Sequence, residues 1–138
     1  MRRTRYWTIC GIVSLAMHVG CGHSGPALAP VSGHVTLDGQ PLFGARLVFQ
    51  PDATGSPSYG STDRDGRYEL GYKRGVKGAM IGSHTVRIQL DKEAASSNGN
   101  AAQRPKSLPA RYNTKSDLRR AVEPGSNVID FELTSAAK

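Results

Sequence analysis

Short runs in which apolar and polar residues alternate are the feature that most constrains the fold of this chain. Such runs occur at residues 31–37, 45–50, 67–70, 85–90 and 129–133. A period of two is the side-chain period of a β-strand, because successive side chains point to opposite faces of a sheet. After residue 30, no window of about 11 residues carries the apolar stripe of an amphipathic helix. The sequence therefore predicts an all-β domain.

Turn dipeptides separate these runs. Asp38-Gly39 suits a two-residue hairpin turn, Asp65-Gly66 precedes the run at 67–70, and Pro124-Gly125 precedes the last run. About seven short strands over about 105 residues match the size of an immunoglobulin-like or transthyretin-like sandwich. We expect an antiparallel β-sandwich of about seven strands, with one short strand within residues 119–123.

The alternation also predicts which side chains fill the core. We expect six apolar side chains to face inward: Leu47, Phe49, Val86, Ile88, Ile129 and Phe131. Four charged neighbours are expected to face water: Arg46, Arg87, Asp130 and Glu132. Shifting a strand by one residue would exchange the two sets, so this prediction tests the register directly.

The N-terminus has the layout of a secretory signal peptide. Arg2, Arg3 and Arg5 precede a mostly apolar run of 14 residues, from position 6 to position 19. A transmembrane helix needs about 20 apolar residues to cross the hydrocarbon core, so the run favours export over a permanent span. We predict that residues 1–20 form a signal peptide.

Cys21 follows this run directly after Gly20. The stretch "HVGCG" resembles the lipobox of bacterial lipoproteins, with His18 at the position where leucine is usual. The resemblance implies that Cys21 is diacylated, begins the mature protein and anchors it to the cell envelope. We expect the anchor in the outer rather than the inner membrane, with the protein facing the periplasm or the cell surface. The alternative is an ordinary signal peptide cut nearby, which would leave a free thiol. Because Cys10 lies inside the signal, no intramolecular disulfide is expected in the mature chain.

Two segments hold few residues that could fill a core. Residues 21–30 are rich in Gly, Ala and Pro, and residues 91–107 are mostly small or polar. Such segments bury too little apolar surface to offset their ordering entropy. We predict a flexible tether at 21–30 and a mobile loop at 91–107 within a domain that spans residues 31–138. The side chains expected to return the chain to the core are Leu108, Tyr112 and Leu118.

The charge of the chain does not indicate a nucleic-acid partner. The formal net charge is +7, and removal of residues 1–20, with three arginines and no acids, leaves +4. The remaining cations are interspersed with acids, as at Arg64 between Asp63 and Asp65, whereas nucleic-acid binding needs a clustered basic surface. We expect no nucleic-acid binding.

The acidic pair Asp63 and Asp65 is better explained as a turn than as a metal site. A helix-loop-helix calcium loop needs several further oxygen ligands and a glutamate about 12 residues in. Here strand residues follow Gly66, and Arg64 and Arg67 would repel a divalent cation. We predict that Asp65-Gly66 forms the turn and that Asp63 accepts backbone N–H bonds. No metal and no cofactor is expected.

The histidines and cysteines do not indicate catalysis. His18 leaves with the signal, and His23 lies in the tether. His34 is predicted to face outward, and His84, at the start of a strand, is predicted to lie at the surface or the rim. Their spacing matches no metal-ligand pattern, and no activated nucleophile is visible. We expect no catalytic residues.

The order of the motifs resembles the carboxypeptidase regulatory-like domain, a transthyretin-like β-sandwich. The resemblance rests on "VSGHVTLDGQPLFGARLVFQPD", "GSTDRDGRYEL" and "GSHTVRIQL", and the half from "SLPARYNTKSDL" is similar to small bacterial lipoproteins built from this domain. It covers residues 31–134, with a departure at "GVKGAMIGSH". It implies a structural or protein-interaction module and no enzymatic activity. Transthyretin-like hydrolases end in Tyr-Arg-Gly-Ser, whereas this chain ends in "FELTSAAK", so a hydrolase ranks last among the alternatives.

Glycan binding is the main alternative function. Sandwich domains on cell surfaces bind sugars through exposed aromatic side chains, which stack on apolar sugar faces. Trp7 leaves with the signal, and Tyr59 and Tyr72 are the aromatic residues expected at the surface. The sequence therefore leaves open whether the partner is an envelope protein, a polysaccharide or none.

Overall fold

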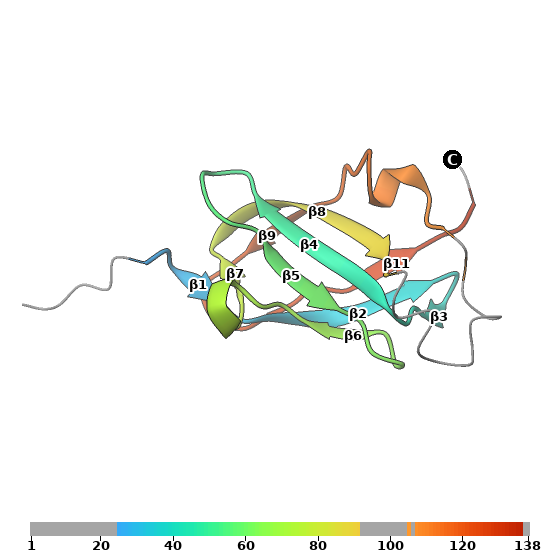
Figure 1. Cartoon of the computed structure of the whole chain (residues 1–138), viewed down its shortest axis with the longest axis horizontal. Coiled ribbons are helices and arrows are strands. Elements are labelled where there is room, and N and C mark those ends of the chain that lie inside the picture. The colour runs from blue at the N-terminus through green and yellow to red at the C-terminus, as the bar shows by residue number, and fades with distance from the viewer. Residues whose placement is uncertain (1–24, 92–104, 106, 137–138) are drawn as a thin grey trace, which may run out of the picture.

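The domain is a sandwich of two β-sheets, seen in a computed structural model that describes residues 25–91, 105 and 107–136 (Figure 1). One sheet contains β2 (Val31–Leu37), β3 (Gln40–Pro41), β6 (Arg67–Glu69), β10 (Asn127–Val128) and β11 (Phe131–Leu133). The other has the order β5 (Ser58–Ser61), β4 (Ala45–Pro51), β8 (Gly82–Leu90) and β9 (Arg119–Val122). The predicted all-β sandwich is confirmed.

Shorter elements complete this part of the chain. β1 (Leu28–Ala29) pairs with β7 (Ala79–Met80), and two 3₁₀ turns follow at η1 (Lys73–Gly75) and η3 (Ala110–Tyr112). Seven of the strands between residues 25 and 136, leaving out the gaps, have three or more residues, which matches the predicted number. They include the predicted strand at β9, which pairs with β8.

The predicted register is confirmed in both sheets. Leu47, Phe49, Val86 and Ile88 are fully buried, and Phe131 is 2% exposed. Ile129 is only partly buried against the core. The four charged neighbours face water as predicted: Arg46, Arg87, Asp130 and Glu132. Each fully buried side chain of this size stabilises the fold by roughly 1.5–3 kcal/mol, so the alternating pattern supplies most of the driving force.

Three aromatic rings hold the two sheets together. The Phe49 ring on β4 lies 6.1 Å from the ring of Phe131 on β11 and 6.5 Å from that of Tyr68 on β6. The Phe49–Phe131 pair is edge-to-face, an arrangement worth about 0.5–1.5 kcal/mol beyond the area that it buries. The Tyr68 hydroxyl donates a 2.6 Å hydrogen bond to the Ile129 carbonyl, so its polar end is satisfied.

The hairpin at the end of β2 has the turn that the sequence predicts. Asp38 and Gly39 have φ angles of 50° and 79°, and Leu37 pairs with Gln40 across the two-residue loop. Both positive angles are those of the mirror-image turns that match strand twist. The Ser135 amide donates to the Asp38 carboxylate at 3.0 Å, and the hydrogen bonds from Ser135 lower the pKa of that carboxyl.

The sheet around β2 is not purely antiparallel, in contrast to the prediction. β10 and β11 both pair parallel to β2, with Phe131 opposite Val35. Parallel neighbours need a long crossover, and here nearly the whole domain separates the strands in sequence. The chain consequently enters at the β1 end and leaves β11 toward the opposite end (Figure 1).

A close backbone approach separates β10 from β11. A Cβ atom on Gly33 would lie 2.0 Å from the Ile129 carbonyl oxygen, so only glycine fits at this point of β2. The ladder is interrupted here, and the Asp130 carboxylate accepts the His34 amide at 2.7 Å in its place. Asp130 thus faces water and still closes the sheet, a role that alternation alone does not reveal.

The N-terminal boundary of the domain differs from the prediction. Leu28 pairs with Met80, Ala29 pairs with Ala79, and Ala29 is 2% exposed. The predicted tether at 21–30 is therefore wrong at its C-terminal end, because β1 pairs with β7 and Ala29 is buried in the core. A Cβ on Gly78 would meet the Ala29 carbonyl at 2.4 Å. Residues 21–24 of the tether lie outside the described residues.

Most of the predicted loop at 91–107 also lies outside the described residues. Asp91 is part of the sandwich, because its amide donates to the Gly44 carbonyl at 2.9 Å. After the gap, Leu108 and Tyr112 are buried and Leu118 is partly buried against the core. These three anchors are confirmed.

Candidate binding face

The four-stranded sheet buries one face and presents the other to solvent. On its open face, cross-strand pairing aligns Tyr59 of β5 with Val48 of β4, and Val48 with Arg87 of β8. Directly opposed residues point to the same side of a sheet, so these three side chains form one row. Tyr59 is 53% exposed, Arg87 is exposed and Val48 is half-buried. We call this row the open-face row.

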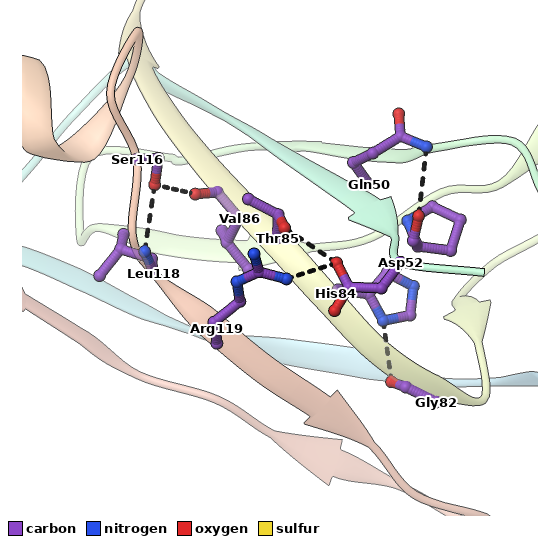
Figure 2. Close-up of polar contacts among 10 residues, drawn as sticks. Gln50, Asp52, Gly82, His84, Thr85, Val86, Ser116, Leu118 and Arg119 are labelled. Atoms are coloured by element: carbon purple, nitrogen blue, oxygen red, sulfur yellow. Dashed lines mark hydrogen bonds and ion pairs between the residues drawn. The ribbon is translucent and has the colours of Figure 1, made fainter.

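Two ion pairs flank the open-face row. Arg119 of β9 contacts the Asp52 carboxylate at 2.8 Å, and the Thr85 hydroxyl donates to the same oxygen at 2.9 Å (Figure 2). On the other side, Arg46 lies 3.2 Å from Asp91. All four charged side chains are partly exposed, so each pair adds little stability. Their charges are matched.

Arg87 differs from these arginines. Among residues 25–91, 105 and 107–136, its side chain has no ion-pair or hydrogen-bond partner. Val48 lies between this unpaired guanidinium and the exposed phenol ring of Tyr59, so the row offers a planar donor at one end and a surface on which a flat group can stack at the other. The sequence predicted that Arg87 and Tyr59 are exposed, but only the pairing of β5, β4 and β8 brings them into one row.

The Asp63 segment forms the predicted turn. The Asp63 carboxylate accepts the amides of Asp65 and Arg67, both at 2.9 Å, and the Gly66 amide donates to the Asp63 carbonyl at 3.0 Å. Gly66 has a φ of +74°, and a Cβ there would lie 2.5 Å from the Val35 carbonyl. Within the described residues, no group of three or more His, Cys, Asp or Glu side chains could hold a metal ion.

Thr62, which is buried beside this turn, was not among the predicted residues. The Thr62 hydroxyl accepts the Ala45 amide at 2.8 Å and donates to the Leu42 carbonyl at 2.6 Å. It thereby ties the turn to the start of β4. The motif "TDRDG" carried this signal, since a threonine at the end of an alternating strand can satisfy backbone groups that the ladder leaves free.

The two histidines of the domain lie in different surroundings. His34 is exposed as predicted; its Nδ1 lies 3.6 Å from Asp130, and its Nε2 accepts from Arg67 at 3.2 Å. The prediction for His84 is wrong, because His84 is 1% exposed. It shares the inward face of β8 with Val86, and its ring lies 5.9 Å from that of Phe49. Figure 2 shows its Nδ1 bonded to the Gly82 carbonyl, at 2.9 Å.

The second predicted surface aromatic, Tyr72, belongs to the turn at η1. Gly71 bridges Tyr59 on one side and Lys77 on the other, so the turn is attached directly to β5. Tyr72 is half-buried, and the Lys73 ammonium lies 5.9 Å from its ring centroid. Tyr59 is therefore the more accessible of the two rings, and Tyr72 contributes to a different surface.

The predicted lipid-attachment residue, Cys21, lies outside the described residues. Within the described ones, no helix has the length and apolar character needed to cross a membrane.

Comparisons with known proteins give no family for the chain. No protein-family model matches it, and no curated protein matches its sequence. A DUF3823 family protein from Parabacteroides merdae ATCC 43184 superposes with a TM-score of 0.44 at 15% identity, over 80% of this chain and 48% of that one. The chain thus spans about half the length of that protein.

A second solved structure is similar at the same low level. It is the dioxygenase domain of a dioxygenase carbohydrate-binding protein fusion from Streptomyces sp. SirexAA-E. The TM-score is 0.40 at 20% identity, over 83% of this chain and 84% of that one. At this similarity neither protein informs the function of the chain.

Proposed function

We propose that the chain is an exported lipoprotein, anchored through Cys21, whose sandwich is a non-catalytic module that binds a component of the cell envelope. The open-face row carries the binding part of this proposal. Its aromatic ring, aliphatic side chain and unpaired guanidinium lie side by side on a regular sheet, where the backbone holds them in fixed register. Side chains on strands are better preorganised for binding than side chains on loops.

The chemistry of the row suits a protein partner. Tyrosine and arginine supply much of the binding energy at protein interfaces, and the row carries one of each. The ion pairs Arg119–Asp52 and Arg46–Asp91 form a polar rim around the row. Anchoring through lipid adds to affinity, because a partner in the same envelope is held at high effective concentration.

A capture experiment tests the binding role. The lipidated protein is used to capture partners from solubilised native envelope, in parallel with Tyr59→Ala/Arg87→Glu and with the control Glu132→Gln on the other sheet. We expect the double variant to capture at least tenfold less of any specific partner, since removal of an interface anchor costs about 2 kcal/mol or more of binding free energy. The control should retain it. Equal capture by all three proteins would contradict a role for this face.

Glycan binding is the second candidate, favoured by the exposure of Tyr59. Tyr59 is 53% exposed and has Val48 beside it, which leaves an apolar platform for a sugar face. Affinity electrophoresis in gels that contain envelope polysaccharides tests this. Tyr59→Phe should keep the retardation and Tyr59→Ala should abolish it, because stacking needs the ring and not the hydroxyl. If the wild-type protein is not retarded, glycan binding is contradicted and the protein-binding role remains.

A further inference from the structure

The pairing of β1 with β7 fixes where the chain leaves the domain toward Cys21. Leu28 and Ala29 pair with Met80 and Ala79, and the Ile81 amide donates to the Ala27 carbonyl at 3.0 Å. Six residues lie between Cys21 and Leu28, so seven Cα–Cα steps join the two. Fully extended, they span at most about 25 Å. Lipid on Cys21 would therefore keep the β1 end of the sandwich within about 25 Å of the bilayer surface.

The turn at η1 lies at this same end of the sandwich (Figure 1). It presents a surface that we call the basal surface, which consists of Tyr72, Lys73, Arg74, Val76 and Ile81. Val76 is 50% exposed and Ile81 is 37% exposed, two of the few large apolar side chains that reach solvent in the described part of the chain. Lys73 and Arg74 stand between Tyr72 and Val76 in sequence.

The basal surface is ordered by its own backbone bonds. The Tyr72 amide donates to the Val76 carbonyl at 2.6 Å, and the Val76 amide donates to the Lys73 carbonyl at 3.2 Å. Arg74 has φ 56° and ψ 35°, a left-handed conformation that L-residues adopt at a cost. Glycine would adopt this conformation without that cost. The backbone alone therefore does not explain why a cationic residue stands at position 74.

The charges at this end leave an excess of cations. Lys77 is paired with Glu69 at 2.9 Å, and Arg119 is paired with Asp52. Within the described residues, neither Lys73 nor Arg74 has an acidic partner. Glu123, in the turn whose Asn127 bonds the Pro30 carbonyl, is a further acid at this end. The excess is modest, and its two cations adjoin the exposed Val76.

We propose that the basal surface docks on the bilayer that holds Cys21 and binds its anionic headgroups through Lys73 and Arg74, with Val76 and Ile81 at the headgroup boundary. This inference rests on the proposed lipid anchor. Each cation near an anionic membrane raises affinity about fivefold, too little for a free domain to bind stably. The anchor removes that limit, because it holds the basal surface within a short reach of the headgroups. Docking would also direct the β11 end of the sandwich away from the membrane.

Hydrogen exchange on a chemically anchored protein tests this. The mature chain, residues 21–138, is coupled through the Cys21 thiol to a maleimide lipid in vesicles, which replaces the natural lipid. Vesicles with phosphatidylglycerol are compared with vesicles of phosphatidylcholine alone. We expect exchange over residues 72–76 to slow several-fold on the anionic vesicles only, and the effect to fade at high salt. Residues 61–66, at the opposite end, should not change.

Matched charge reversals locate the effect. Lys73→Glu/Arg74→Glu should lower docking at least tenfold and abolish the slowing. Arg64→Glu/Lys115→Glu, which reverses the same amount of charge outside the basal surface, should leave it intact. Thermal melts check that both variants fold. Identical exchange on the two kinds of vesicle, or loss of the slowing in both variants, would overturn the proposal.

The outcome is separable from that of the lipid anchor. The intact mass of the native protein reports whether Cys21 carries lipid, whereas the coupled protein reports docking alone. Slowed exchange with an unmodified native Cys21 would support docking and contradict the anchor. A lipidated Cys21 with no slowing would contradict docking only.

Discussion

Replacement of Phe131 by alanine tests the packing between the two sheets of the sandwich. Phe131 is 2% exposed on β11, and its ring meets those of Phe49 at 6.1 Å and Tyr68 at 6.3 Å. The Arg120 guanidinium lies 4.9 Å from the centroid of the Phe131 ring. Truncation removes a buried ring and leaves a cavity between two sheets that the strand ladders hold apart. We expect a loss of about 3–5 kcal/mol, toward the upper end because the site cannot collapse easily.

This loss is a large share of the roughly 5–15 kcal/mol that stabilises a typical domain. Urea unfolding of the mature chain with Cys21→Ser measures it as a lower midpoint at unchanged slope. Glu132→Ala, one residue along on the exposed face, is the matched control and should stay within about 0.5 kcal/mol. Phe131→Leu keeps most of the volume and should fall between the two.

The comparison is sensitive to register because residues 131 and 132 lie on opposite faces of β11. If Glu132→Ala is as damaging as Phe131→Ala, the last strand is displaced by one residue and the cross-sheet aromatic cluster is wrong. A changed slope for Phe131→Ala would instead mean that the variant unfolds from a less compact native state, and the free-energy difference would need a second probe.

Other predictions address separate parts of the chain. The native protein should carry lipid on Cys21, and two acyl chains make such anchoring stable. The Cys21→Ser variant should therefore leave the detergent phase in partitioning experiments. Full membrane partitioning of this variant would contradict lipidation. Millimolar calcium should leave the melting temperature unchanged, and a calcium-dependent rise of several degrees would mean a bound ion. Asp63→Ala removes the acceptor of two backbone amides and should lower the free energy of unfolding by about 1–2 kcal/mol. Burial raises the pKa of Tyr68, and the negative charge of the nearby Asp130 raises it further. The neutral phenol therefore stabilises the fold fully below about pH 10, which is the pKa of tyrosine in the unfolded chain. This contribution is lost as the pH rises further. Tyr68→Phe should therefore be less stable than wild type by about 0.5–1.5 kcal/mol at pH 7, with a gap that narrows above pH 10 in denaturant melts; a constant gap would contradict burial of the hydroxyl.

Much of the candidate site could be predicted in parts but not as an arrangement. Alternation placed Arg87 outward, and the supply of aromatic residues pointed to Tyr59. Neither observation contains the pairing β5–β4–β8, so the open-face row of Tyr59, Val48 and Arg87 could not be derived from them. The error at His84 has the same origin. His84 faces inward because it alternates in step with Val86 and Ile88. Its place at the end of the strand instead suggested the rim of the sandwich, where burial depends on what packs against the side chain. Phe49 is what packs there.

The sequence by itself determined the strands, their faces and their turns, because each depends on neighbours within a few residues. Period two requires only local backbone geometry, and Asp38-Gly39 and Asp65-Gly66 set their φ angles without help from the rest of the chain. Only the tertiary structure decided that β11 runs parallel to β2 and that Leu28–Ala29 joins the fold under β7. Both depend on contacts between segments far apart in the chain, whose free energy comes from surfaces that meet only after folding. The same contacts bring the basal surface to the end from which the chain leads to Cys21.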